Sequence, residues 1–215
     1  LLPETIGSIA YLSKNKKNMK ENVICGFNLS CVGDERCFSH LQSPYGNNLA
    51  DLALSSSLIG LDNVKTYSFL KRGSDERQYC SPGVDLPLCT FSRSKFGEYP
   101  EYHTSADNFS LVTNKGLEDS FNIMKNIIDA FEFGIFPVNN FSCEPQLGKR
   151  GLYPNLSKKS NIKRSSENRM NILAYCNGKN SIFDICKFVG LNLNIVLEEL
   201  KLLRDNQLIL IKQDD

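Results

Sequence analysis

Three short polar stretches of the sequence carry the side chains that could do chemistry together. Glu4 lies in Pro-Glu-Thr-Ile-Gly-Ser, Asp75 in Gly-Ser-Asp-Glu-Arg, and His103 in Glu-Tyr-His-Thr-Ser. Carboxylate oxygens and an imidazole nitrogen are ligands that zinc accepts, and a carboxylate can also act as a general base. By spacing alone this is a weak metal pattern, because a lone histidine in a polar loop is usually a surface residue. The other histidine, His40, alternates within an expected strand and is interpreted as structural.

Alternating strands and helices must position these stretches. Period-two apolar residues predict strands over residues 22–33, 37–42, 64–70 and 83–91. Helical spacing of apolar residues predicts helices over 48–59 and 117–131. The alternation indicates an α/β domain with a mainly parallel sheet. Because sites in such sheets lie at strand ends, we expect Glu4, Asp75 and His103 to converge in one pocket.

The last third of the chain has a different pattern. Residues 145–168 carry six lysines or arginines against one acid, which indicates a basic linker or irregular segment, with an anion-binding patch as the alternative. Helical patterns then cover 167–175, 182–189 and 194–203, and a strand covers 208–211. We therefore divide the chain into an α/β domain, a basic segment and a winged-helix domain, with bounds 1–145, 146–166 and 167–215.

A winged helix often binds DNA through its third helix, here expected to be capped by Asn194. That helix carries Glu198 and Glu199 against Lys201 and Arg204. Because a phosphate backbone rewards several cations, this balance argues against nucleic acid and favours packing or protein contact. DNA regulation remains an alternative function.

The composition excludes several classes of protein. The chain has 215 residues, a mass of 24.2 kDa and a formal net charge of +1, with 41% hydrophobic and 23% charged residues. Such a chain can bury a sizeable core and is not wholly disordered, collagenous or coiled coil. No apolar run approaches the roughly 20 residues that span a bilayer, so we expect no membrane partner.

The eight cysteines form no Cys-x-x-Cys pair and lie among apolar or strand-like residues. This favours free thiols in a reducing compartment, so we expect a cytoplasmic protein. The first residues lack the pattern of a signal peptide and an initiator methionine. We interpret Leu1-Leu2 as the remnant of a strand, which predicts that a preceding half of the protein is missing.

Four longer motifs carry a resemblance to a known family. They are Pro-Glu-Thr-Ile-Gly-Ser, Gly-Ser-Asp-Glu-Arg-Gln-Tyr-Cys-Ser-Pro-Gly, Gly-Glu-Tyr-Pro-Glu-Tyr-His-Thr-Ser and Cys-Glu-Pro-Gln-Leu-Gly-Lys-Arg-Gly-Leu-Tyr-Pro. Together they resemble the C-terminal half of a bacterial aminopeptidase-like family, related to the co-catalytic zinc aminopeptidases. Members of that family end in a winged helix and are often encoded among polysaccharide-biosynthesis genes.

The resemblance implies the phosphorylase/aminopeptidase-like three-layer α/β/α fold and hydrolysis by zinc-activated water. Glu4 would be the general base, and Asp75 and His103 would be zinc ligands. The substrate would carry a free amino group on a peptide or aminoacyl conjugate. Other residues of the motifs are candidates for substrate contact or for positioning the ligands: Thr5, Tyr102, Asp107, Arg150 and Tyr153.

The sequence departs from the parent motifs at two positions. Thr5 stands where the zinc aminopeptidases have a second, metal-binding glutamate, and Glu76 stands where they have a histidine. Two further ligands of the family come from motifs upstream of Glu4. A catalytic zinc takes three protein ligands, so Asp75 and His103 alone predict no tight site. A truncated sheet would leave an apolar face or edge open, so the missing half or a second copy of the chain is an expected partner. A non-catalytic scaffold is the second hypothesis.

Overall fold

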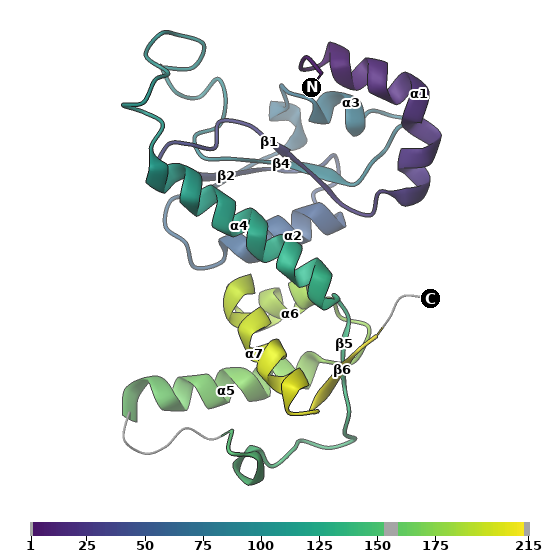
Figure 1. The fold of residues 1–215 in the computed structure, drawn as a ribbon, viewed down its shortest axis with the longest axis vertical. Coiled ribbons are helices and arrows are strands. Elements are labelled where there is room, and N and C mark those ends of the chain that lie inside the picture. The colour runs from purple at the N-terminus through teal and green to yellow at the C-terminus, as the bar shows by residue number, and fades with distance from the viewer. Residues whose placement is uncertain (1, 153–158, 213–215) are drawn as a thin grey trace. The chain divides into compact units, whose positions relative to one another are not determined.

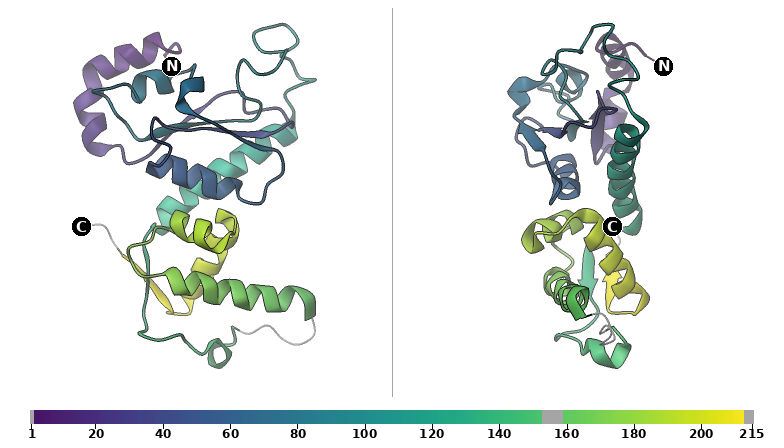
Figure 2. Two further views of the ribbon diagram at one scale, coloured as in Figure 1. Left: turned by 180° about the vertical axis from the view of Figure 1, so that it is seen from behind. Right: turned by 90° about the vertical axis from the view of Figure 1, so that its left-hand side faces the viewer.

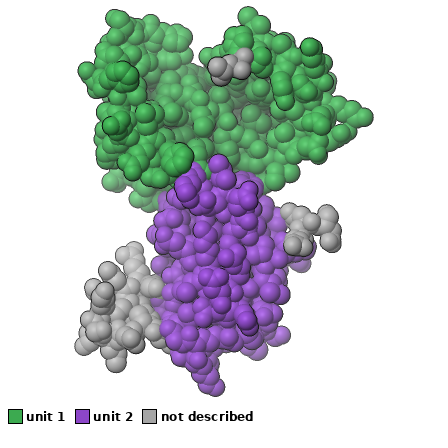
Figure 3. Space-filling view, in the orientation of Figure 1, with its two compact units in different colours: residues 1–124 green, residues 125–215 purple. Residues whose placement is uncertain are grey.

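The structure, a computed structural model, describes residues 2–152 and 159–212, and the side chains of all of these except 159–165. The chain forms two compact units, residues 1–124 and 125–215 (Figure 3). Helix α4 (Asn114–Phe133) belongs partly to each unit. Among the described residues, no helix is both long and apolar enough to cross a bilayer.

The first unit is built on a four-stranded sheet with the order β1-β4-β2-β3. Its strands are β1 (Gly26–Leu29), β2 (Phe38–Leu41), β3 (Val64–Tyr67) and β4 (Leu88–Ser92). The pairs β1–β4 and β2–β3 are parallel, and the central pair β2–β4 is antiparallel. The sheet is therefore mixed, and parallel in two of its three pairings. All five residues of β4 are buried, as expected for an interior strand.

Helices cover both faces of this sheet. On one side lie α1 (Ile6–Asn22) and α3 (Glu76–Tyr79), and on the other lies α2 (Leu49–Leu58) (Figure 1). The same arrangement is visible from behind and from the side (Figure 2). A short 3-10 helix, η1 (Phe69–Lys71), links β3 to α3. The unit is thus a layered α/β/α domain, as the resemblance implies.

The C-terminal helix of this unit, α4, approaches the loop after β1 closely. A Cβ atom on Gly116 would lie 2.1 Å from the carbonyl oxygen of Gly33, so only glycine fits there. One turn further along the helix, the Ser120 hydroxyl donates to the carbonyl of Val32 over 2.7 Å. The buried guanidinium of Arg93, directly after β4, donates to Asp119 of α4 over 3.3 Å. These contacts fix the loop that follows β1.

The second unit is a winged helix. It contains η2 (Leu147–Arg150) and the helices α5 (Lys159–Tyr175), α6 (Ile182–Val189) and α7 (Leu193–Asp205), with the antiparallel strands β5 (Pro137–Asn139) and β6 (Ile209–Ile211). An ion pair of 2.6 Å between the largely buried side chains of Arg169 and Glu199 ties α5 to α7. Glu199, one of the two acids of α7, therefore stabilises the packing of this unit.

Three details of this unit differ from the sequence-based expectation. Strand β5 pairs with β6, so the winged-helix unit begins before residue 145. Helix α5 starts at Lys159, inside the segment predicted to be an irregular linker. The N-cap of α7 is Asn192 and not Asn194, because the Asn192 side chain accepts the backbone N–H of Asn194 over 3.0 Å.

The cysteines offer a direct test of the predicted thiol state. All eight are unpaired, and only Cys143 is exposed. Burial raises the pKa of Cys176 to about 12, and burial with the nearby Asp51 charge raises that of Cys25 to about 12. Because the thiolate is the reactive form, we expect Cys143 to react with a thiol reagent much faster than the buried cysteines in the native protein. A titration in denaturant should then count eight thiols, and fewer in a freshly prepared sample exposed to neither oxidant nor reductant would refute the prediction.

Candidate functional site

Glu4 and Asp75, which are far apart in sequence, lie next to one another where α1 and α3 begin. The Ser74 hydroxyl donates to Oε1 of Glu4 over 2.6 Å, and the backbone N–H of Thr5 donates to Oδ1 of Asp75 over 2.6 Å. The Ser8 hydroxyl donates to the same Asp75 oxygen over 2.9 Å. No described residue donates to the second oxygen of either carboxylate. Each carboxylate is thus held by one oxygen and keeps the other available for a ligand or water.

The backbone of Thr5 has an unusual conformation. Its φ of 63° and ψ of −64°, with a 2.7 Å hydrogen bond from the N–H of Ile6 to the carbonyl of Glu4, define a classic γ-turn. This turn is rare and strained, above all for a β-branched residue. The guanidinium of Arg77 donates to the Thr5 hydroxyl over 2.8 Å, and Asp75 holds the Thr5 N–H. Strain that is held in place by neighbouring side chains is typical of functional sites.

The strain can be measured with two variants. Thr5→Gly and Thr5→Ala both lose the hydroxyl that meets Arg77, so they differ only in the Cβ atom. Glycine elsewhere is less stable than alanine by about 0.5–1 kcal/mol, but here we expect Thr5→Gly to be the more stable by about 1 kcal/mol. Urea denaturation of both variants gives the difference. An alanine variant that is as stable as the glycine variant would show that the turn is unstrained.

Glu76 fixes the loop that carries Ser74 and Asp75. It is only 1% exposed, and its Oε1 accepts the backbone N–H of Gly73 and of Ser74 over 2.6 and 3.0 Å. Its Oε2 accepts hydrogen bonds from Asn28 and Thr90, which face one another across β1 and β4, over 2.8 and 3.2 Å. The residue that the sequence marked only as a departure from histidine therefore anchors the site to the sheet.

Glu76 and Arg77 are functional candidates that the sequence did not assign to the site. Both belong to the Gly-Ser-Asp-Glu-Arg motif, but their distant partners lie just before α1 and in β1 and β4. The only sequence signal was that charged residues adjoin Asp75.

His103 lies on an exposed loop and has no hydrogen-bond or ion-pair partner within the described part of the chain. Its backbone φ is 59°, and its ring stacks on that of Tyr102 with 3.9 Å between centroids. Burial raises the pKa of Tyr102, and the charges of Cys31 and Glu4 raise it further. Burial is the largest cause that raises the pKa of Tyr99, followed by a hydrogen bond with Cys31. The charge of Asp107 raises this pKa further. No contact joins His103 to Asp75 in the described structure.

One group of three potential metal ligands occurs among the described residues, and it excludes Glu4, Asp75 and His103. The ligand atoms of His40, Asp51 and Cys89 lie within 4.8 Å of one another, and all three residues are buried. Within the described structure, Glu4, Asp75 and His103 do not form a ligand group of this kind.

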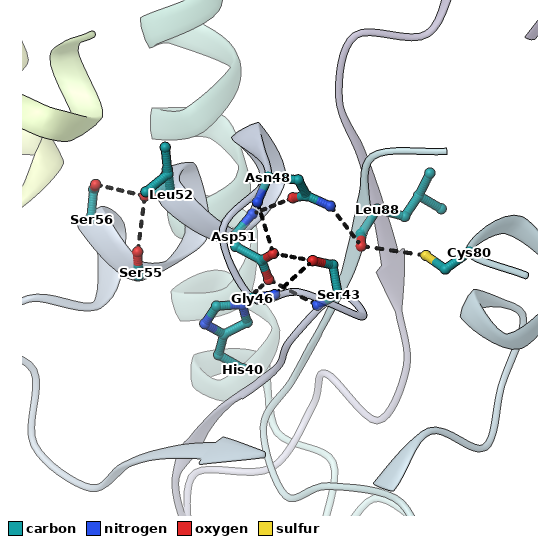
Figure 4. Close-up of polar contacts among 10 residues, drawn as sticks. All are labelled: His40, Ser43, Gly46, Asn48, Asp51, Leu52, Ser55, Ser56, Cys80 and Leu88. Atoms are coloured by element: carbon teal, nitrogen blue, oxygen red, sulfur yellow. Dashed lines mark hydrogen bonds and ion pairs between the residues drawn. The ribbon is translucent and has the colours of Figure 1, made fainter. Parts of the chain in front are cut away.

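The carboxylate of this buried group is already occupied by hydrogen bonds (Figure 4). Oδ1 of Asp51 is 2.9 Å from Nε2 of His40 and accepts the Ser43 N–H over 3.0 Å. Oδ2 accepts the Ser43 hydroxyl and the Asn48 N–H, which closes the capping box at the start of α2. Burial would raise the pKa of Asp51, but the hydrogen bonds from His40 and Ser43 outweigh it and lower the pKa.

Burial and the Asp51 charge raise the pKa of the third member, Cys89, well above its usual value. Both oxygens of Asp51 already accept hydrogen bonds, so a metal bound here would have to replace the contacts of Asp51 with its neighbours. This geometry supports the structural interpretation of His40.

Two further residues of the sequence motifs belong to the second unit. The guanidinium of Arg150 lies over the ring of Phe141, 4.8 Å from its centroid, and donates to the carbonyl of Asn206 over 3.4 Å. Tyr153 lies outside the described residues.

Comparison with known families divides the chain in a similar way to the structure. The family described as a domain of unknown function (DUF4910) matches residues 1–133, and the winged helix-turn-helix family matches residues 136–211. The first match ends at the last residue of α4, and the second begins one residue before β5.

Two relatives from Clostridium acetobutylicum match over most of this chain. One, named as a polysaccharide biosynthesis protein with an aminopeptidase-like domain, is 36% identical over 191 residues, which are 88% of this chain and 44% of the relative. The other, a crystal structure named as that of a peptidase, is 32% identical, with a TM-score of 0.80 over 98% of this chain and 47% of its own. The chain therefore spans less than half the length of each relative.

Proposed function

Because this chain belongs to the aminopeptidase-like DUF4910 family and ends in a winged helix-turn-helix domain, we propose that it is part of a hydrolase that removes amino-terminal residues. The substrate is a peptide or a peptide-like aminoacyl conjugate with a free amino group. The observation that carries the proposal is the hydrogen-bonded pairing of Glu4 and Asp75 through Ser74 and Thr5.

In this proposal Glu4 is the general base. Its carboxylate is exposed to solvent, and the hydrogen bond from Ser74 to Oε1 fixes its orientation. The free oxygen accepts a proton from the water that attacks the scissile carbonyl and then delivers that proton to the leaving amine. Arg77 and Glu76 are positioning residues in this proposal, because they hold Thr5 and the Ser74–Asp75 loop.

The described residues do not complete a zinc site. A catalytic zinc takes three protein ligands and an open position. Asp75 offers one free oxygen and His103 offers a ring nitrogen, but the two do not form a three-ligand group with any other described residue. We therefore propose that zinc, if it is the metal of the full protein, takes its remaining ligands from outside residues 1–215. The proton transfer assigned to this chain involves only Glu4, the attacking water and the leaving amine.

A non-catalytic scaffold is the second candidate. It is favoured by Thr5, which stands where a metal-binding glutamate is expected and whose hydroxyl is bonded to Arg77 instead. The Arg77 guanidinium places a positive charge next to Thr5, where a metal ion would otherwise supply one.

Metal analysis separates the two candidates. A chain extended to the full length of the relatives should retain zinc after dialysis and lose it on Asp75→Ala, while Asp62→Ala, an exposed acid without a described partner, should retain it. Residues 1–215 alone should bind zinc weakly. An extended chain that retains no zinc, and whose thermal stability does not respond to a chelator, would favour the scaffold.

A further inference from the structure

The loop between β5 and α5 carries a motif for which the proposed hydrolase has no use. Residues 141–150 form a pocket of about 610 Å³ within the second unit. Its volume lies in the range of small-molecule sites. The lining combines one aromatic ring, two cations, a carboxylate and an amide: Phe141, Lys149, Arg150, Glu144 and Gln146.

Within this loop, residues 140–150 are held at both ends by the turn that joins α7 to β6. At its start, Asn140 donates its backbone N–H to the carbonyl of Leu208 over 3.0 Å and its side-chain amide to that of Gln207 over 3.1 Å. At its end, Arg150 donates to the carbonyl of Asn206. Between them Leu147 is fully buried. A loop anchored at both ends and in the middle pays little conformational entropy when a ligand binds.

The charges of the pocket select an anionic group. Lys149 is exposed, and its ammonium has no hydrogen-bond or ion-pair partner among the residues described. The Arg150 guanidinium is oriented by the Phe141 ring and the Asn206 carbonyl. Lysine and arginine bind phosphate and carboxylate groups through charge-assisted hydrogen bonds.

The rest of the lining suits a polyhydroxylated ring. Phe141 is 41% exposed and offers an apolar surface on which the C–H face of a sugar can pack. Glu144 and Gln146 supply acceptors and a donor for hydroxyl groups. We propose that this pocket binds an anionic sugar, with the phosphate or carboxylate on Lys149 and Arg150 and the ring on Phe141. Every residue of this site belongs to the second unit, so the proposal does not rest on the proposed hydrolase function.

Calorimetric titration of residues 1–215 tests this site with four probes: glucose 1-phosphate, glucuronate, glucose and inorganic phosphate. Glucose 1-phosphate, glucuronate or both should bind more tightly than glucose and inorganic phosphate, and the comparison of the two distinguishes a phosphate from a carboxylate. Lys149→Ala should weaken that binding by about tenfold or more, because a charge-assisted contact is lost. Phe141→Ala should weaken it as well, while Lys179→Ala, an exposed lysine of the same unit, should leave it unchanged.

Three results would overturn the proposal. They are no binding of either anionic sugar at millimolar concentration, binding that is unaffected by Lys149→Ala and Phe141→Ala, and inorganic phosphate that binds as tightly as glucose 1-phosphate. Lys149 is exposed and unpartnered in the described structure, so its replacement leaves the fold intact and a loss of binding reports on the pocket.

Discussion

Replacing Asp51 with alanine should lower the free energy of unfolding by about 3–5 kcal/mol, the typical cost of breaking a buried pair. The carboxylate is only 2% exposed and serves His40, the Ser43 hydroxyl and the backbone N–H groups of Ser43 and Asn48. Its removal leaves these groups buried without an acceptor and opens the capping box of α2. Urea denaturation measures the loss, and Asp62→Ala, an exposed acid, should change stability by less than about 0.5 kcal/mol.

The pH dependence of this effect has a definite sign. Because the pKa of Asp51 is lowered in the folded protein, its contribution is fully present above the ordinary aspartate pKa of about 4. The contribution is lost as the pH falls through the lowered folded pKa. The stability difference between the wild type and Asp51→Ala should therefore shrink on acidification below about pH 4. A difference that grows in acid, or a wild-type melting temperature that falls on adding a chelator at neutral pH, would point instead to a metal bound by His40, Asp51 and Cys89.

Replacing Glu4 with glutamine should reduce kcat of the full-length protein by about 10²–10⁴-fold, the usual contribution of a general base. The amide cannot accept the proton of the attacking water, but its oxygen can still accept the Ser74 hydroxyl, so the local structure should be retained. Glu4 is not a proposed zinc ligand, so the metal content should not change. The measurement is turnover of an aminoacyl substrate together with metal analysis of the same sample.

Glu118→Gln is the matched control, because Glu118 is an exposed glutamate of α4 with no hydrogen bond or ion pair in the described structure. It should retain wild-type turnover. Full activity of Glu4→Gln would remove Glu4 from the mechanism, whereas a loss of both zinc and activity would show that Glu4 binds the metal.

Elements with a clear apolar period could be predicted from the sequence. The strands β2 and β3 and the helices α2, α4 and α6 lie within or close to their predicted ranges. Helix α1 was not predicted by periodicity, because its apolar residues do not form one buried face: it buries Gly7, Ser8 and Leu12, while Ile9 and Tyr11 are exposed. Strand β5 has three residues, too few for a period to be recognised.

The site was predictable only in part, for a physical reason. The motifs marked Glu4 and Asp75, but the hydrogen bonds that orient them join residues about 70 positions apart. Glu76 likewise acquires its role from Asn28 and Thr90, which only the pairing of β1 with β4 brings together. His103 follows the motif pattern, yet its loop places it on the surface, stacked on Tyr102. A local pattern identifies residue types, while their partners depend on the tertiary fold.

The most direct test of the proposed function is the hydrolysis of paired substrates by a chain of the relatives' full length. A dipeptide amide with a free amino group and the same compound with an acetylated amino group should be compared, each with and without a chelator. We expect cleavage of the free-amine substrate only, with loss of activity in chelator and recovery on addition of zinc. Cleavage of neither substrate by the zinc-loaded protein would contradict the account and leave the scaffold as the function of this fold.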